Sequence, residues 1–399
     1  MSIIVKMGKY LLRFLCVCLV TLIPKKKSIW IFGAWFGKKF SDNPKYMYQY
    51  VESLHSNEMT PVWIAKDRML VSELRKQGIN AYYHNSFTGV YYQLVSKVAF
   101  VGHSISSDLN PCFIGFNTKR VQLWHGIPLK KIGFDDKIFT SKNHLIQKYQ
   151  VLFSLLVNDR YDLVISTGDK CSTLFSSAFN EPLKKIIKTG FPRNDVFLTM
   201  SNEKTLETPF KVIYMPTFRG GIGDEFDLFE SYGFNLDEID SMFSLANIEL
   251  HIRTHPANCP PASLLSKIKE CQKVKISTID DIYESINSYD CLVTDYSSII
   301  FDFILSRKPI LFAPFDLENY LKVDRELYFS YSTVSEDKIC RSWPELINQI
   351  LDLKNHPDKF ENSNQFIRSF HDEINLEGNC FSLNIYNEVN KLIDKSIYF

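Results

Sequence analysis

Residues 120–131 read RVQLWHGIPLKK, a short apolar run that ends in His125 and then turns on Gly126 and Pro128. This pattern predicts a β-strand whose last residues place an imidazole at the carboxyl edge of a sheet. Open α/β sheets bind their ligands at that edge. Histidine titrates near neutral pH, so the ring can serve there as an acid or a base. The alternative is a histidine whose ring packs beside Trp124 and bonds to the backbone.

A second histidine repeats the pattern downstream. Residues 249–256 read ELHIRTHP, which predicts a strand followed by His255 at a proline turn. Arg253 adds a cation beside His255, as Lys130 does beside His125. Two strand-end histidines with cationic neighbours predict a site for a phosphorylated substrate. The alternative for His255 is a buried structural role.

The rest of the chain alternates between short β-rich runs and helix-length stretches, which favours βαβ units and mostly parallel sheets. Residues 198–209 are polar and predict a linker, after which the same plan restarts. We therefore predict an α/β fold with two Rossmann-like doubly wound domains that face each other across a cleft. The predicted strands are Ser28–Phe32, Pro61–Ala65, Val98–Val101, Val121–Trp124, Leu163–Ser166, Lys211–Met215, Ile248–Arg253, Val274–Ile276, Cys291–Thr294 and Pro309–Phe312.

These elements predict a division of the chain into four parts. Residues 28–208 form an N-terminal domain for the acceptor, and residues 209–376 form a C-terminal domain for the donor. Residues 377–399 form a helix that packs back across the linker. Residues 1–27 precede the first domain as a separate segment.

The N-terminal segment is apolar and flanked by lysines. Residues 10–24 are broken only by an arginine and a threonine, and Lys25, Lys26 and Lys27 follow them. A spanning helix needs about 20 apolar residues, and this stretch is shorter. The pattern favours a short helix that lies on an anionic membrane surface. The alternative is a helix buried in the core or against a partner.

Composition excludes several other classes of protein. A net charge of +1 provides no general basic field, so we predict no nucleic-acid partner. The nine cysteines lack the spacing of a metal site and are typical of reduced thiols. The chain has neither a Walker lysine loop nor a G-x-G-x-x-G motif. We therefore predict no metal and no cofactor.

Two further strand-end motifs carry arginine, which can bind phosphate through two parallel hydrogen bonds. Residues 189–195 (TGFPRND) place Arg193 at a Gly/Pro turn, and residues 214–221 (YMPTFRGG) place Thr217 and Arg219 after another strand. The alternative for the first motif is a surface ion pair between the arginine and the nearby aspartate. The alternative for the second is an ordinary strand-to-loop turn.

The strongest local signal is residues 291–298, CLVTDYSS, where a buried strand leads through Asp295 to Ser297 and Ser298. The apolar residues that follow predict a helix that begins at the serines. Free N–H groups and the helix dipole attract an anion at such a position. The serines can equally be plain N-caps, and capping is compatible with phosphate binding.

Taken in order, these motifs resemble the CDP-glycerol glycerophosphotransferase family of teichoic-acid and capsule synthesis. The resemblance covers about residues 29–320. It rests on Trp124-His125-Gly126, Thr189-Gly190 with Pro192-Arg193 and Asp195, Pro216-Thr217 with Arg219, His255-Pro256, Thr294-Asp295-Tyr296-Ser297-Ser298 with Phe301-Asp302, and Phe315-Asp316-Leu317-Glu318-Asn319-Tyr320.

The resemblance implies a GT-B fold and transfer of a polyol phosphate from CDP-glycerol or CDP-ribitol to the hydroxyl of a lipid-linked or glycan acceptor, with release of CMP. It implies His125 as the base and His255 as a partner of the donor phosphate. A peripheral position on the cytoplasmic face of the cell membrane is also similar to that family. The implied donor- and phosphate-binding residues are Gly126, Lys130, Arg193, Thr217, Arg219, Arg253, Asp295, Ser297, Ser298 and Glu318.

Two other functions remain open on the sequence. A GT-B glycosyltransferase that uses a nucleotide sugar would need the same kinds of side chain. A non-catalytic membrane-bound scaffold in capsule assembly would tolerate replacement of both histidines.

Overall fold

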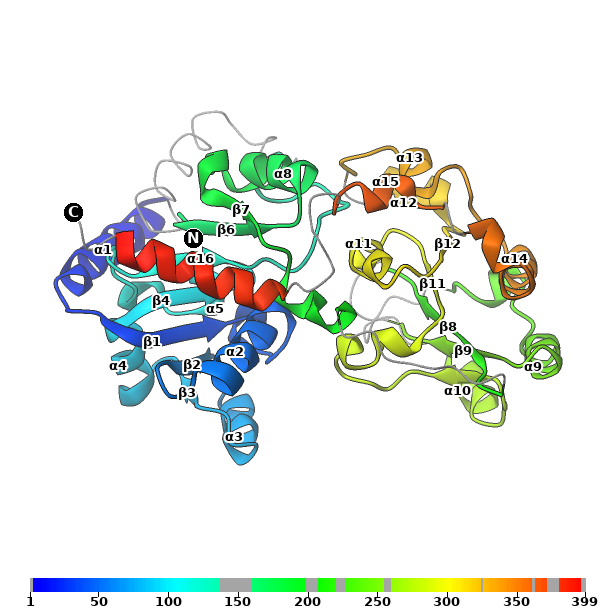
Figure 1. Ribbon diagram of the computed structural model, residues 1–399, viewed down its shortest axis with the longest axis horizontal. Coiled ribbons are helices and arrows are strands. Elements are labelled where there is room, and N and C mark those ends of the chain that lie inside the picture. Colours follow the sequence, from blue (N-terminus) through cyan, green and yellow to red (C-terminus); the bar gives the residue numbers. More distant parts are fainter. Residues whose placement is uncertain are drawn as a thin grey trace. The chain divides into compact units, whose positions relative to one another are not determined.

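The computed structural model describes residues 3–136, 160–198, 207–219, 227–254, 260–323, 326–360, 363–371 and 380–395. The chain divides into two compact units (Figure 1). Unit 1 consists of Met1–His125, Ile132–Leu198 and His371–Phe399, and unit 2 consists of Gly126–Lys131 and Thr199–Phe370. His255 lies outside these ranges.

Unit 1 is built on a sheet of seven parallel strands among its described residues, in the order β3-β2-β1-β4-β5-β6-β7. Central strands are apolar on both faces, as expected for a parallel sheet covered on both sides. Residues 98–101 of β4, for example, are fully buried. The strands are β1 (Lys26–Gly33), β2 (Thr60–Ala65), β3 (Ala81–Tyr83), β4 (Ser96–Val101), β5 (Lys119–Gln122), β6 (Leu163–Ser166) and β7 (Ile186–Lys188).

Helices connect these strands and cover the sheet (Figure 1). Side chains cap several of them where the strands end: Asp67 accepts from the first-turn N–H groups of α3, and Ser86 does so for α4. The helices of unit 1 are α1 (Ile3–Thr21), α2 (Asp42–His55), α3 (Arg68–Lys76), α4 (Phe87–Val95), α5 (Ile105–Asp108), α8 (Asp169–Phe179) and α16 (Phe381–Lys395), with short 3-10 turns η1 (Trp35–Gly37), η2 (Pro111–Phe113), η3 (Gly133–Asp135), η4 (Leu183–Lys185) and η5 (Pro192–Phe197).

Unit 2 repeats the same plan with five parallel strands in the order β10-β9-β8-β11-β12 among its described residues. The strands are β8 (Phe210–Met215), β9 (Ile248–Ile252), β10 (Val274–Ile276), β11 (Cys291–Thr294) and β12 (Ile310–Phe312). The helices are α9 (Leu236–Leu245), α10 (Ala262–Ile268), α11 (Ile299–Phe303), α12 (Leu317–Val323), α13 (Tyr331–Ser335), α14 (Trp343–Asn355) and α15 (Gln365–Arg368), with 3-10 turns η6 (Glu230–Tyr232), η8 (Ile282–Glu284), η9 (Ile286–Ser288), η10 (Ile304–Ser306) and η11 (Pro357–Phe360).

The predicted α/β fold with parallel, doubly wound sheets is confirmed. Two details differ from the sequence prediction. The strand predicted as Val121–Trp124 ends at Gln122, because Trp124 adopts a left-handed φ of 49° that cannot continue a strand. The edge strand β3 was not predicted, and it pairs only with β2.

The predicted N-terminal apolar stretch forms α1, which packs through Val17 and Val20 and leaves other leucines exposed. Its last turn is tied to the loop before β5: the backbone N–H of Phe116 donates to Thr21 Oγ1, and Asn117 Nδ2 donates to the Thr21 carbonyl. Among the described residues, no helix combines the length and apolarity needed to cross a bilayer.

The carboxylate of Asp195 binds the first residues of the C-terminal helix α16. Asp195 accepts hydrogen bonds from the backbone N–H groups of Phe381 and Ser382 and from the Ser382 hydroxyl. Gly190 lies where an added Cβ would overlap the Phe381 ring, so the turn before Asp195 needs glycine for close approach as well as for its φ of 77°. Asp195 therefore caps α16.

We expect Asp195→Ala to lower the free energy of unfolding by about 2–3 kcal/mol, because three donors lose a buried acceptor. Urea denaturation followed by circular dichroism measures this change. Asp394→Ala is the matched control on the same helix: its ion pair with Lys27 is exposed, so its loss should cost less than about 1 kcal/mol. Equal effects of the two substitutions would contradict the assignment of Asp195 as the cap.

Candidate active site

Backbone strain is concentrated where β1 and β5 end in unit 1. Trp35, Phe36, Asp42 and Trp124 all have positive φ values, of 46°, 58°, 65° and 49°. Left-handed backbone costs a non-glycine residue about 1–3 kcal/mol, and such costs cluster at functional sites. His125 follows directly after the last of these residues, and Gly126 then takes a φ of 112° that favours glycine. The strained turn presents His125 at the carboxyl edge of the sheet.

The His125 ring is oriented by a carbonyl group. Its Nδ1 lies 3.2 Å from the carbonyl oxygen of Gly102 at the end of β4. A carbonyl oxygen can only accept, so Nδ1 of the neutral ring carries the proton and Nε2 holds the free lone pair. The pKa of His125 is lowered mainly by burial, and the charge of Arg193 adds to this effect, while Asp42 and the Gly102 carbonyl oppose it. The site therefore favours a neutral imidazole.

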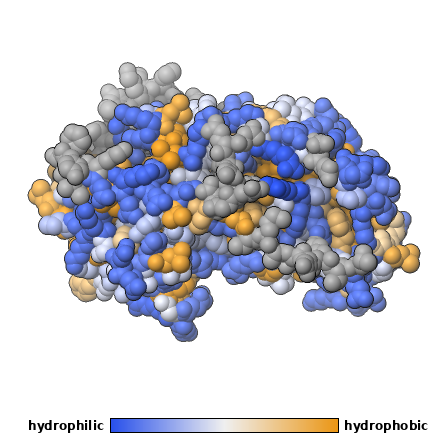
Figure 2. Space-filling model, in the orientation of Figure 1, coloured by the Kyte–Doolittle hydropathy of each residue, from blue (hydrophilic) through white to orange (hydrophobic). Residues whose placement is uncertain are grey.

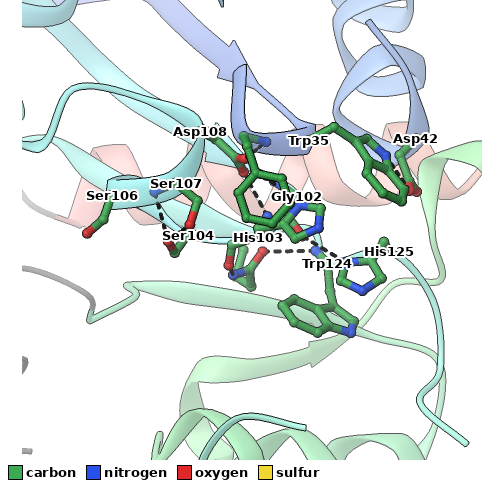
Figure 3. Close-up of polar contacts among 12 residues, drawn as sticks. Trp35, Asp42, Gly102, His103, Ser104, Ser106, Ser107, Asp108, Trp124 and His125 are labelled. Carbon is green, nitrogen blue, oxygen red and sulfur yellow. Dashed lines mark hydrogen bonds and ion pairs between the residues drawn. The ribbon is translucent and has the colours of Figure 1, made fainter. Parts of the chain in front are cut away.

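A second histidine stacks on the first (Figure 3). The ring centroids of His103 and His125 lie 4.5 Å apart, with an angle of 26° between the ring planes. The ring centroids of Trp124 and His125 lie 4.0 Å apart. Burial, and then the neighbouring His125, lower the pKa of His103 to about 4, against the opposing charge of Asp42. Both rings are therefore neutral near pH 7.

The loop that carries His103 is held by Asp108, which is fully buried. Its carboxylate accepts from the backbone N–H groups of Phe36, Gly102 and His103 at 2.9, 3.0 and 2.7 Å. Burial raises the pKa of Asp108 to about 6, although these three hydrogen bonds and Lys66 favour the charged form. One carboxylate thus joins the ends of β1 and β4.

A second buried group joins the His125 turn to the Arg193 turn. The amide of Asn43 donates to the carbonyl oxygens of Leu123 and Trp124 at 3.1 and 3.0 Å and accepts from the Arg193 backbone N–H at 3.2 Å. The neighbouring Asp42 accepts from Arg193 Nη1 at 2.6 Å. These contacts link segments about 150 residues apart.

Arg193 lies in the interior of unit 1 and not on its surface. The side chain is 5% exposed, so the alternative of a surface ion pair does not describe it. Its guanidinium pairs with Asp42, whose other oxygen accepts from Trp35 Nε1 at 3.2 Å. This geometry favours a role in holding the loop beside His125.

In unit 2, the predicted phosphate ligand Arg219 lies between two carboxylates. Its guanidinium donates to both oxygens of Asp316, at 2.7 and 2.9 Å, and to Asp295 at 2.6 Å. Although burial disfavours its charge, these carboxylates raise the pKa of Arg219. The rings of Tyr296 and Tyr320 lie 4.9 and 4.8 Å from its central carbon. This arrangement favours a structural role at the ends of β8 and β11.

Asp295 organises the loop that carries Thr217. It is fully buried and accepts from the backbone N–H and the hydroxyl of Thr217 and from the backbone N–H of Tyr296. The half-buried Ser297 and Ser298 come next, and Ser298 makes no side-chain capping hydrogen bond with α11. Ser298 thus occupies the N-cap position without a capping side chain, whereas Ser297 Oγ accepts from the backbone N–H of Ile299 at 3.4 Å.

The remaining predicted residues occupy varied environments in unit 2. Arg253, after β9, donates to the carbonyl oxygens of Ile279 and Asp280. Lys130 lies in a short segment that pairs with Leu327, and its ammonium group is 5.0 Å from the Tyr320 ring. Glu318 is exposed in the first turn of α12.

Within unit 1 the structure brings together His125 and Arg193, and within unit 2 it brings together Thr217, Arg219 and Asp295. His255 lies outside the described residues, so its predicted role stays a prediction. Among the residues that are described, no group of three or more His, Cys, Asp or Glu is placed to hold a metal ion.

Sequence reasoning missed His103, Asp42, Asn43 and Asp108. Each lies two to ten residues beyond the end of β1 or β4. A search for polar residues just after every predicted strand would have found His103, which follows the end of the predicted strand Val98–Val101 by two residues. Asp42 and Asn43 bind Arg193 about 150 residues away, and Asp108 binds Phe36 72 residues away, so these contacts could not be inferred from the sequence.

Known proteins resemble the chain over most of its length. A family profile described as CDP-Glycerol:Poly(glycerophosphate) glycerophosphotransferase matches residues 15–377. The teichoic acid glycerol-phosphate transferase of Staphylococcus aureus is 28% identical over 368 residues, which is 88% of this chain and 88% of that protein.

The teichoic acid poly(glycerol phosphate) polymerase of Staphylococcus epidermidis is 29% identical over 324 residues, which is 77% of this chain and 43% of that protein. The chain thus spans less than half the length of that polymerase. The solved structure of the wall teichoic acid polymerase TagF matches with a TM-score of 0.73 and 22% identity, over 98% of this chain and 96% of that one, which shows a shared fold.

The neutral His103 predicts a dependence of stability on pH. Its pKa of about 4 in the folded chain lies below the ordinary value of 6.5, so the unfolded chain binds a proton that the folded chain does not. Stability is therefore full above about pH 6.5 and falls as the pH drops towards about 4. At about pH 5 the unfolding free energy lost through this residue is on the order of 2 kcal/mol.

His103→Phe keeps a ring against His125 but cannot titrate. We expect it to reduce the loss of unfolding free energy between about pH 7.5 and about pH 5, measured by urea denaturation. His356→Phe, which alters an exposed histidine at the end of α14, should leave that loss unchanged. An unaltered pH dependence in His103→Phe would contradict the neutral state assigned to this ring.

Proposed function

We propose a reaction on the premise that the chain belongs to the CDP-glycerol:poly(glycerophosphate) glycerophosphotransferase family, which the match over residues 15–377 shows. The chain transfers glycerol phosphate from CDP-glycerol to a hydroxyl group of an acceptor, and CMP leaves. Such a transfer needs a base for the acceptor hydroxyl, contacts that neutralise the diphosphate, and precise positioning of both substrates.

The observation that carries this proposal is the orientation of His125. The carbonyl oxygen of Gly102 accepts a hydrogen bond from Nδ1–H, which leaves Nε2 as the basic nitrogen. Burial lowers the pKa of the ring, so the base form persists near neutral pH. A positioned base of this kind contributes a rate factor on the order of 10²–10⁴.

The proposed reaction is an in-line displacement at the β-phosphorus. The acceptor oxygen attacks the β-phosphorus of CDP-glycerol while His125 Nε2 removes the hydroxyl proton. The bond from the β-phosphorus to the bridging oxygen breaks, and CMP leaves with that electron pair. The products are a phosphodiester that joins glycerol phosphate to the acceptor, CMP, and a protonated His125.

The remaining predicted residues support the donor in two ways. We assign Ser297, Ser298, Arg253 and Lys130 to direct contact with the donor phosphates, and His255 to the same role on the sequence alone. Buried groups support them: Asp295 holds the Thr217 loop, and Arg219 neutralises that carboxylate. In unit 1, Arg193 supports His125 through Asp42. Gly126 supplies the turn, and Glu318 is available to a hydroxyl of the donor.

We extend the proposal to the envelope polymer that is made. Curated relatives act in teichoic acid synthesis as transferases and as polymerases. The acceptor is then a lipid-linked or glycan chain of a teichoic-acid-like or capsular polymer. CDP-ribitol is the second donor to test, because it presents the same diphosphate.

The N-terminal helix supports attachment to a membrane surface. Leu11, Leu15 and Leu19 lie on one face of α1 and are 61%, 52% and 68% exposed. Figure 2 shows hydrophobic residues at the end of unit 1 where α1 lies in Figure 1. Lys25, Lys26 and Lys27 follow the helix. An apolar stripe beside lysines is typical of a helix that binds an anionic leaflet from one side.

We expect His125→Ala to lower kcat for transfer from CDP-glycerol by about 10²–10⁴-fold, because the base is lost while the donor contacts remain. Mass spectrometry of products made from purified protein, CDP-glycerol and membrane lipid extract measures this change. His356→Ala is the control, because that histidine is exposed on α14. Full turnover by His125→Ala would refute the role of the base. Transfer from a nucleotide sugar without polyol-phosphate transfer would refute the reaction.

We expect Leu15→Glu combined with Leu19→Glu to weaken binding to vesicles of anionic phospholipid by about a hundredfold, because each leucine contributes about 1.5–3 kcal/mol when buried. Vesicle flotation measures the bound fraction. Leu245→Glu is the matched control, since that leucine is 90% exposed at the end of α9. Equal flotation of the native chain and the double variant would show that α1 does not bind the membrane.

A further inference from the structure

A basic cavity lies on unit 1 at the end of the sheet formed by β3. It has a volume of about 530 Å³, and Arg68, Arg75 and Lys76 line it together with Tyr83 and others. Arg75 and Lys76 follow Arg68 by seven and eight residues, which is about two helical turns, so the three cations lie on one face of α3. None of the described residues that line the cavity is acidic. No role in the proposed reaction has been assigned to this cavity.

The arginines are held in fixed orientations by aromatic rings. The guanidinium of Arg68 lies 4.3 Å from the Tyr83 ring, and that of Arg75 lies 4.6 Å from the Tyr82 ring. Arg75 Nε also donates to the carbonyl oxygen of Ala81 at 2.7 Å. A guanidinium stacked on a ring loses little additional freedom when it binds, and its planar fork fits a phosphate group. The cavity is therefore organised in advance for a phosphate.

One end of the cavity, formed by Arg68, Tyr83 and Ser86, lies at the same edge of the sheet as His125, and the cavity extends along α3 to Arg75 beside Ala81. Tyr83 and Ser86 follow the end of β3, and His125 follows the end of β5. Four strand spacings separate β3 from β5 in the order β3-β2-β1-β4-β5, so the two sites lie about 19 Å apart along the edge. Lys39 and Trp35 lie after β1, between these sites, with the ammonium group 5.4 Å from the indole ring.

We propose that this cavity binds a phosphodiester of the growing acceptor chain, several repeats away from the hydroxyl that reacts at His125. The inference rests on the proposed function, in which every transfer adds one phosphodiester and one negative charge to the acceptor. An acceptor with several polyol-phosphate repeats reaches from His125 to Arg68, whereas an acceptor with a single repeat does not. The cavity therefore makes the chain more effective on longer acceptors.

A phospholipid headgroup offers the same phosphate chemistry, but the location favours the acceptor chain. The exposed leucines belong to α1, which ends shortly before β1 begins and so lies towards the amino edge of the sheet. The cavity opens at the carboxyl edge through Arg68 and Ser86, and Figure 2 shows hydrophilic residues over α3. The exposed Phe87 beside Ser86 is the feature that a membrane would use, so vesicles form a separate arm of the test.

The test uses the full chain with Arg68→Gln combined with Lys76→Gln. Among the described residues, neither side chain makes a hydrogen bond within the fold, and both side chains are exposed. Removal of Arg68 from the first turn of α3 favours the helix dipole, whereas removal of Lys76 from the last turn opposes it by less than about 1 kcal/mol. Arg75 is retained because it holds the Ala81 carbonyl. Arg160→Gln, which alters an exposed arginine before β6, is the matched control.

The first measurement is binding of a poly(glycerol phosphate) oligomer by calorimetry without donor, which does not depend on transfer. We expect the double variant to bind about tenfold more weakly than the native chain and the control, because two charge-assisted contacts are lost. The native affinity should fall as salt rises. No binding by the native chain, or equal binding by the double variant, would overturn the proposal.

The second measurement is transfer to lipid-linked acceptors that carry one or several glycerol phosphates. The double variant should raise KM for the longer acceptor about tenfold and leave kcat, and KM for the shorter one, unchanged. Equal increases for both acceptors would overturn the proposal. So would loss of binding to anionic vesicles while oligomer binding is kept. Absence of transfer by the native chain would refute the reaction and leave the calorimetric result to decide the cavity.

Discussion

The hydrogen bond between His125 Nδ1 and the Gly102 carbonyl decides which ring nitrogen can accept a proton. It forms because β4 and β5 are neighbours and end at the same edge of the sheet. The left-handed Trp124 then turns the chain so that the next side chain faces back towards β4. The strand order thus places the turn beside Gly102, the turn orients the His125 ring, and the Gly102 carbonyl selects the ring tautomer.

Buried polar groups stabilise these strained strand ends. Asp108 and Asn43 satisfy the backbone groups that the strand ends leave unpaired, and Asp42 neutralises Arg193. Unit 2 uses the same device at the corresponding strand ends, where Arg219 joins two carboxylates. A buried charge without such partners would be strongly destabilising. The pairs therefore make each loop rigid.

Much of the fold could be predicted from the sequence because parallel strands are continuous apolar runs. Leu163–Ser166, Val274–Ile276 and Cys291–Thr294 were predicted with the bounds that the structure has. The end of β5 could not be predicted, because the left-handed φ of Trp124 is imposed by tertiary packing. The short β3 lacks a recognisable period, and its pairing with β2 is what makes it a strand.

The site could be predicted only in part for a related reason. His125 stands out beside Gly126 in the sequence, whereas the value of His103 depends on a ring contact across two strands. Arg219 was predicted as a phosphate ligand from its neighbours, but its carboxylate partners lie 76 and 97 residues away. Residue type identifies groups that can do chemistry, and long-range pairing decides which of them remain free to do it.

The state of the His125 ring is the most direct test. Nitrogen-15 NMR of the histidine-labelled chain, with His125→Asn to assign the signal, reports both the tautomer and the titration. The structure predicts a neutral ring with its proton on Nδ1 and a pKa below the ordinary 6.5. A ring with its proton on Nε2, or one that is still charged at about pH 7, would contradict the role of His125 as the base.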